Sequence, residues 1–244
     1  MKRYALIMPA VLASSALFTG FALAGDPAPK AAIAPAPSSD LEVNFGAGYT
    51  SDYIFRGGDN GTNLFDMTLE FSGSGNLGAL GGLDWTAGIW YASYSATGGG
   101  SNNELDLYSQ VSKSLSDMLD VAVGVTNYSY FGNDGSDDDI EPYVSLSTAM
   151  GEIALGATAY YDEGPGDWYY EVSAAYERAL SDSCTLGLAA VVGFGDESDD
   201  FVGGTASLSF AVSDDITVTP HVSATSSDDL GDHTFTGVSV GFGF

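Results

Sequence analysis

Apolar and polar residues alternate along most of the chain from Leu41 to Phe244, in segments of about ten residues. In LEVNFGAGY, residues 41–49, every second residue is apolar, and the positions between are Glu, Asn and Gly. In NLFDMTLEF, residues 63–71, Asp66 and Glu70 lie on the face opposite the large apolar residues. Because successive side chains of a strand point to opposite faces, this pattern predicts strands with one apolar and one polar face.

The same alternation recurs in ten later segments, so the sequence predicts twelve strands. These are LDWTAGIWYASY, ELDLYSQV, LDVAVGVTNYSYF, IEPYVSLSTAM, EIALGATAYY, DWYYEVSAAY, CTLGLAAVVGF, FVGGTASLSFAV, ITVTPHVSAT and HTFTGVSVGF. Connections after even strands are mostly tight, and those after odd strands, such as GGDNGT and GNDGSDDD, are acidic or glycine-rich. An even strand count with this asymmetry favours a closed, antiparallel, up-and-down transmembrane β-barrel over residues 41–244. Periodicity alone also allows a soluble β-sandwich.

The first 40 residues have a different composition. Residues 1–24 have a basic start, an apolar core and a small-residue site, Ala22-Leu23-Ala24, which together predict a cleaved secretory signal peptide. A retained N-terminal membrane helix is the alternative. Residues 25–40, GDPAPKAAIAPAPSSD, are rich in Pro and Ala and predict a periplasmic linker. Together these segments predict an exported protein of the outer membrane.

Two further features favour the barrel. The last strand ends on alternating Phe242 and Phe244, typical of the C-terminal signal that the barrel-assembly machinery reads. Tyr and Trp gather near predicted strand ends, as membrane-interface girdles require. They are Tyr49, Tyr53, Tyr91, Tyr94, Tyr128, Tyr130, Tyr160, Tyr161, Trp168 and Tyr170.

The charge balance is strongly acidic. With 6 Lys and Arg against 33 Asp and Glu, the formal net charge is −27. The cations beyond the signal segment are Lys30, Arg56, Lys113 and Arg178. This excludes nucleic acid as a natural partner, because phosphate binding requires a basic surface. The expected partners are outer-membrane lipid and lipopolysaccharide, and small hydrophilic solutes or cations.

One short stretch carries a family resemblance. GAGYTSDYIFRG, residues 46–57, resembles the opening strand of the TorF-type family of small Gram-negative outer-membrane porins. NELDLYSQV (103–111) and WYYEVSAAYE (168–177) are similar to that family as well. The resemblance implies a porin fold and passive permeation. After FRG this chain continues with GDNGT and not with the Ile-Ser-Gln type of sequence that is usual in the family. The resemblance therefore implies no particular substrate.

Parity along the strands predicts which charges face the lumen. An unbroken first strand places Tyr53 and Phe55 outward and Arg56 inward at the extracellular mouth. The inward acids are then Asp52, Asp66, Glu70, Asp84, Asp106, Glu141, Glu171 and Glu177. Lys113 and Arg178 fall on the outward parity. The sequence therefore predicts a weakly cation-selective pore in which Arg56 shapes the mouth, or pairs with Asp52 or Asp66.

Two other classes remain open at this stage. A barrel lipid hydrolase would need His221 or His233 as its base, and the sequence contains no hydrolase motif around either. A non-conducting structural or surface-interaction barrel would arise if Tyr108, Tyr143, Tyr160 and Tyr169 filled the lumen. The acidic runs do not have the spacing of a dedicated Ca²⁺ loop, so no metal and no cofactor is expected.

Overall fold

The computed structural model describes residues 41–76, 81–132, 138–195, 200–228 and 230–243, and these form a closed barrel of twelve strands. The strands are β1 Glu42–Phe55, β2 Gly58–Asn76, β3 Gly82–Ala96, β4 Ser101–Ser116, β5 Leu119–Phe131, β6 Asp139–Met150, β7 Ile153–Asp162, β8 Asp167–Ser181, β9 Cys184–Gly195, β10 Phe201–Ala211, β11 Ile216–Ser227 and β12 Gly231–Gly243. The predicted fold class and strand number are confirmed. The predicted signal peptide, the linker and Phe244 lie outside the described residues.

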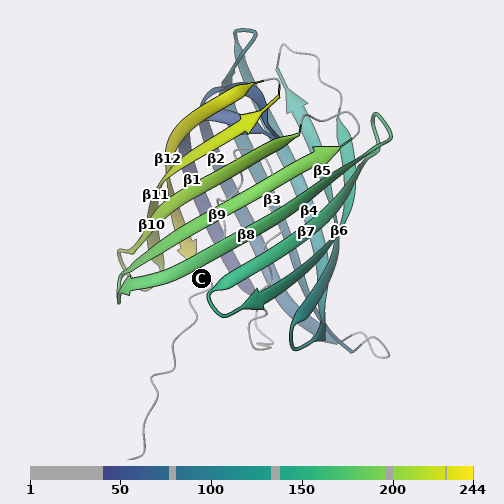
Figure 1. The fold of residues 1–244 in the computed structure, drawn as a ribbon, viewed down its shortest axis with the longest axis vertical. Helices are drawn as coiled ribbons and strands as arrows, with labels where there is room; N and C mark the ends of the chain where they lie inside the picture. The colour runs from purple at the N-terminus through teal and green to yellow at the C-terminus, as the bar shows by residue number, and fades with distance from the viewer. Residues whose placement is uncertain (1–40, 77–80, 133–137, 196–199, 229, 244) are drawn as a thin grey trace, which may run out of the picture.

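Each strand pairs antiparallel with its neighbour in sequence, and β1 pairs with β12 to close the barrel (Figure 1). The closing register runs from Asn44↔Gly243 to Thr50↔Gly237. The tight connections β4–β5, β6–β7 and β8–β9 lie at the same end as the C-terminus, which is the lower end in Figure 1. We call this the turn end and the opposite end the loop end.

The two faces of the wall differ as the alternation predicts. Large apolar side chains point outward and are exposed, including Phe65 at 58% and Val172 at 52%. Their neighbours in sequence point into the barrel. No helix among the described residues is long and apolar enough to cross a membrane. Exposed apolar surface of this extent has no water-compatible role in a soluble monomer, so the exterior is the lipid-facing surface of a membrane barrel.

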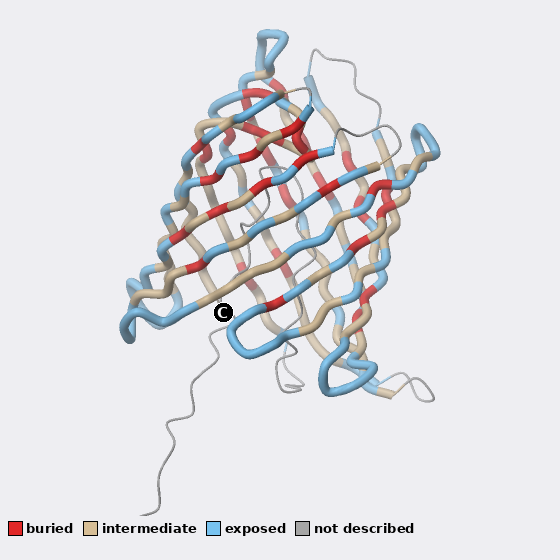
Figure 2. The backbone as a smooth tube through the Cα atoms, in the orientation of Figure 1, coloured by how far each residue is buried: buried red, intermediate tan, exposed pale blue. Residues whose placement is uncertain are grey.

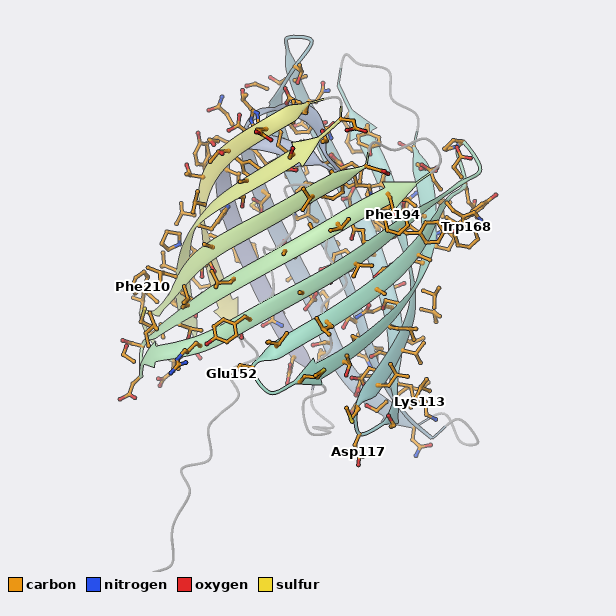
Figure 3. All side chains as sticks on the ribbon, viewed as in Figure 1. Lys113, Asp117, Glu152, Trp168, Phe194 and Phe210 are labelled. Atoms are coloured by element: carbon orange, nitrogen blue, oxygen red, sulfur yellow. The ribbon has the colours of Figure 1, made fainter. Side chains whose placement is uncertain are left out.

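Aromatic residues cover part of the exterior near the loop end. Tyr161, Trp168, Tyr170 and Phe194 form a continuous row of ring contacts with centroid separations of 5.2, 6.3 and 5.6 Å. Figure 3 shows Trp168 and Phe194 projecting from this end and Phe210 lying near the turn end. The predicted girdle is wrong for Tyr53, Tyr94, Tyr128 and Tyr160, which are buried inside the barrel.

The first hairpin differs most from expectation. GGDNGT was predicted as a loop, but β2 begins at Gly58 and only Arg56 and Gly57 lie between the paired residues Phe55 and Gly58. Both turn residues have positive φ, 48° and 80°, as a type I′ turn requires. The backbone twist of a type I′ turn matches the right-handed twist of the two strands, so β1 and β2 stay paired up to the turn.

The end of this hairpin, residues 51–58, bends into the barrel, and we call it the hairpin tip. Tyr53 and Ile54 are consecutive and both are 0% exposed. The β1–β2 register shifts between them, and a second shift in β2 lies beside Asn63, whose φ is 55°. Such bulges bend a strand out of its sheet. The outward placement of Tyr53 and Phe55 was therefore wrong, because both faces of a strand inside the barrel are surrounded.

Candidate lumen site at the hairpin tip

The hairpin tip is tied to the opposite wall by an ion pair. Arg56 donates through Nη1 and Nη2 to Oε2 and Oε1 of Glu141 on β6, each at 2.7 Å. The two side chains are 12% and 2% exposed. This fork-to-fork geometry is the strongest arrangement of a guanidinium with a carboxylate. The predicted partners of Arg56, Asp52 and Asp66, are not the residues that hold it.

Three aromatic rings surround the same guanidinium. The Arg56 Cζ lies 4.1 Å from the ring centroid of Tyr169, 4.7 Å from that of Tyr160 and 4.8 Å from that of Phe55. Cation–π attraction is strongest where the cation is desolvated, as here. Among the described residues, Glu141 and three rings thus form a cage around Arg56, and of these groups Phe55 belongs to the hairpin.

The wall side of this cage is held by its own hydrogen bonds. The Tyr128 hydroxyl donates to Oε1 of Glu141 at 3.2 Å. The hydroxyls of Tyr169 and Tyr160 donate to Oε1 and Oε2 of Glu171 at 2.8 and 3.4 Å. None of these bonds involves the hairpin, so β5 to β8 supply part of the positioning of the carboxylates and rings themselves.

The turn itself is tightly seated. Ser227 on β11 donates through Oγ to the carbonyl oxygen of Gly57 at 2.8 Å. A Cβ at Gly57 would lie 2.7 Å from Cβ of Phe201 and 2.9 Å from Cβ of Ser227, so only glycine fits. Arg56 is the residue that the turn itself would not favour, because a non-glycine left-handed conformation costs about 1–2 kcal/mol. Its side-chain contacts offset that cost.

The tip also contacts β4 and an apolar cluster. The Tyr53 hydroxyl donates to Oε2 of Glu104 at 2.7 Å. Ile54 packs with Phe201 and Phe235 in a cluster that also contains Tyr160 and Tyr169. The tip therefore crosses the interior and contacts strands on opposite sides. Figure 2 shows that most buried segments lie in the half near the loop end.

The predicted lumen acids lie inside the barrel but do not form one group. Glu141 and Glu171 lie at the cage, and Asp106 is 0% exposed beside Glu104 on β4. Asp52 contacts His233, with 3.3 Å between Oδ1 and Nε2. The remaining four lie on the turn-end side of the tip: Asp66 and Glu70 on β2, Asp84 on β3 and Glu177 on β8.

Sequence reasoning missed several residues of this site, among them Glu104 and Tyr53. Glu104 has the same parity as Asp106, two residues later, so alternation alone could have found it. The inward position of Tyr53 had no comparable signal. Of the three Lys and Arg residues in the described ranges, Arg56 lies inside, whereas Lys113 and Arg178 lie near the turn end and share the parity of outward residues such as Val111 and Leu180. The interior of the described barrel is therefore acidic.

The half of the interior toward the turn end is lined by small and polar side chains. Tyr108 and Tyr143 point inward here, and each ring lies over a glycine of the neighbouring strand, Gly88 and Gly124 respectively. A Cβ at either glycine would collide with the ring. The Tyr108 hydroxyl donates to Oε2 of Glu70 at 3.2 Å, and that of Tyr143 donates to Oε1 of Gln110 at 3.2 Å. The rings are thus held against the wall.

The histidines do not form a hydrolase arrangement with the residues around them. Ser51 donates through Oγ to Oδ2 of Asp52 at 2.6 Å, and His233 contacts the other oxygen of that carboxylate. The carboxylate lies between hydroxyl and imidazole, whereas a serine nucleophile needs the imidazole in the middle. His221 lies against Gly237. Within the described ranges, no three His, Cys, Asp or Glu side chains are grouped as a metal site.

No protein-family profile matches the chain, and no curated protein sequence matches it. The resemblance to the TorF-type family is therefore not established by these comparisons.

Solved structures share the fold. An outer membrane channel from Pseudomonas putida F1 aligns with a TM-score of 0.57 and 11% identity, over 90% of this chain and 100% of that one. The NanC porin aligns at 0.53 and 16%, over 83% and 99%. Outer membrane phospholipase A from Escherichia coli aligns at 0.50 and 14%, over 83% and 92%. Channels and an enzyme thus share this barrel, so the likeness establishes the fold and leaves function to the site.

Proposed function

We propose that this chain is a porin-like channel of the outer membrane, through which small hydrophilic solutes or ions diffuse passively. The proposal places the apolar exterior in lipid and the acidic interior in water. Assembly in that membrane involves its lipid and lipopolysaccharide and the barrel-assembly machinery, which reads Phe242 and Phe244. An evolutionary relation to the TorF-type porins is part of this proposal and rests on residues 46–57.

The observation that carries the proposal is the position of the inward tyrosines. Side chains can fill the interior of a small barrel, and Tyr108 and Tyr143 are large enough to contribute. Their rings instead lie over Gly88 and Gly124, where any larger residue would push them toward the axis. Glycine weakens a strand, and at these two points it leaves room for the rings beside the wall and away from the axis.

The interior charge supports weak cation selectivity. Asp66, Glu70 and Asp84 line the turn-end half, and Glu104, Glu141 and Glu171 lie around the hairpin tip. Arg56 offsets one of these charges. An acidic, water-filled channel with low-dielectric walls concentrates cations and repels anions. Catalysis is not part of the proposal.

The hairpin tip supports a second candidate, a non-conducting structural or surface-interaction barrel. Tyr53 and Ile54 are fully buried inside the loop-end half. If the tip seals this half permanently, no solute passes. The two candidates predict opposite results in one experiment.

That experiment is single-channel recording of the refolded chain in a planar bilayer under a KCl gradient. The proposal expects stepwise conductance and a reversal potential of cation-selective sign. Arg56→Ala is expected to conduct more than the parent, and Arg178→Ala, which removes an outward cation, serves as its matched control. A folded barrel that carries no current, with or without Arg56, would establish the non-conducting alternative.

A further inference from the structure

We infer that the cage on β6, β7 and β8 is a binding site for small solutes that carry a guanidinium group, and that Arg56 occupies it as an internal competitor. This inference rests on the proposed function and specifies its substrate class and gating. Glu141, Tyr160 and Tyr169 form the wall side of the site. In its occupied state the hairpin tip crosses the interior.

The first step is that the site exists without its occupant. Tyr128 orients Glu141, and Glu171 fixes Tyr160 and Tyr169, through hydrogen bonds that do not involve the hairpin. A carboxylate and two rings positioned in this way are preorganised for a cation, so little ordering remains for a ligand to supply. When the hairpin leaves, these groups stay on the wall.

The second step is the chemical class of the ligand. The paired 2.7 Å hydrogen bonds to both oxygens of Glu141 require a planar fork of donors. The rings of Tyr160 and Tyr169 lie near the guanidinium carbon at 4.7 and 4.1 Å. A guanidinium matches both features, whereas an ammonium offers a compact point charge that neither forks nor stacks. The site therefore selects guanidinium over alkylammonium.

The third step is that the competitor can be displaced. Arg56 is held in a left-handed turn conformation that Asn or Gly would adopt with less strain. The strain of this conformation favours release of Arg56 from the cage. Because Arg56 is tethered to the barrel, it competes with a free solute as a ligand at about millimolar effective concentration would. A solute with a guanidinium group can enter from the loop end and bind Glu141 in place of Arg56. The hairpin tip then loses its ion pair with β6. Solute binding would thereby open the channel to its own class of solute.

Binding tests the site directly. The probe is agmatine, titrated by calorimetry into the refolded chain in detergent micelles, and 1,4-diaminobutane is the control of equal charge that has no guanidinium. Arg56→Ala is expected to bind agmatine at least about tenfold more tightly than the parent chain, because its site is vacant. Arg56→Ala/Glu141→Gln is expected to lose this binding. Equal affinity of agmatine for the parent and for Arg56→Ala, or equal binding of agmatine and 1,4-diaminobutane, would overturn the inference.

Conductance tests the gating and needs no variant at Arg56. Agmatine added at the loop end of the parent chain is expected to raise the open probability, and 1,4-diaminobutane at equal ionic strength is not. Glu141→Gln is expected to abolish the difference between the two. If the parent chain conducts but agmatine does not change its open probability, the inference is contradicted and the proposed function is unaffected. Absence of current in every variant contradicts the proposed function, and calorimetry then decides the binding site alone.

Discussion

The Tyr53 hydroxyl donates a 2.7 Å hydrogen bond to Glu104, and this bond joins β1 to β4 through the interior and not along the wall. Glu104 is 1% exposed, so its charge depends on such a donor. The bond therefore anchors the hairpin tip to β4, two strands away from Glu141 on β6.

Tyr53→Phe is expected to destabilise the barrel by about 1.5–3 kcal/mol, which is the usual worth of a hydrogen bond to a charged group. Urea unfolding of the refolded chain in lipid vesicles measures the change. Tyr91→Phe is the control, since that hydroxyl makes a 2.8 Å bond to Asn103 on the exposed exterior. Equal losses in both variants would mean that burial of Glu104 adds nothing to its bond.

Gly88→Ala tests the position of the interior rings. The new methyl group collides with the end of the Tyr108 ring and must push it from the wall. We expect a lower single-channel conductance and a loss of about 1–3 kcal/mol in stability, as is typical of overpacking. Gly82→Ala is the matched control, because nothing lies within 4 Å of its added Cβ. Unchanged conductance in Gly88→Ala would show that Tyr108 does not border the solute path.

Selectivity should depend on the inward acids and on salt. Asp66→Asn/Glu70→Gln removes two interior charges, so the reversal potential in a KCl gradient is expected to move toward zero. The shift should be large near 0.01 M and small near 1 M, where the Debye length falls from about 30 Å to about 3 Å. Asp117→Asn, in the exposed β4–β5 turn, should leave the reversal potential unchanged. A shift that is independent of salt would point to altered pore shape.

Phe242→Ala tests whether Phe242 serves recognition by the assembly machinery in the cell or stability of the folded barrel. Its ring contacts Phe45 with centroids 5.8 Å apart, and such a pair contributes about 0.5–1.5 kcal/mol. Phe242→Ala should therefore refold in vitro almost as the parent does. In cells, the heat-modifiable folded fraction seen on gels is expected to fall if Phe242 belongs to the assembly signal. Phe210→Ala, which removes an exposed aromatic side chain near the turn end, controls for lost hydrophobic area.

Alternation predicted the barrel because a wall between lipid and lumen repeats the same local rule on every strand. Residues such as Met67 and Asp66 obey it, and so does Glu104. The rule fails at Tyr53, where consecutive side chains are both buried. The odd or even position of a residue predicts whether its side chain points inward or outward only while the strand lies in the barrel wall. Bulges that bend a strand out of the wall have no reliable sequence signature.

The partner of Arg56 could not be predicted for a related reason. Asp52 and Asp66 are near in sequence or on the adjacent strand, whereas Glu141 lies 85 residues away on β6. A two-residue turn that folds into the interior reaches across the barrel instead of along it. Only the three-dimensional path of residues 51–58 decides which carboxylate a lone arginine meets.

The seat of Gly57 against Phe201 and Ser227 also dictates an order of events. The tip comes from the first two strands synthesised, yet its contacts on β6, β8, β10 and β11 follow 85 to 170 residues later. That seat does not exist until the last strands have joined the first. During biogenesis, Gly57 can therefore reach its final position only after β10 and β11 have joined the barrel.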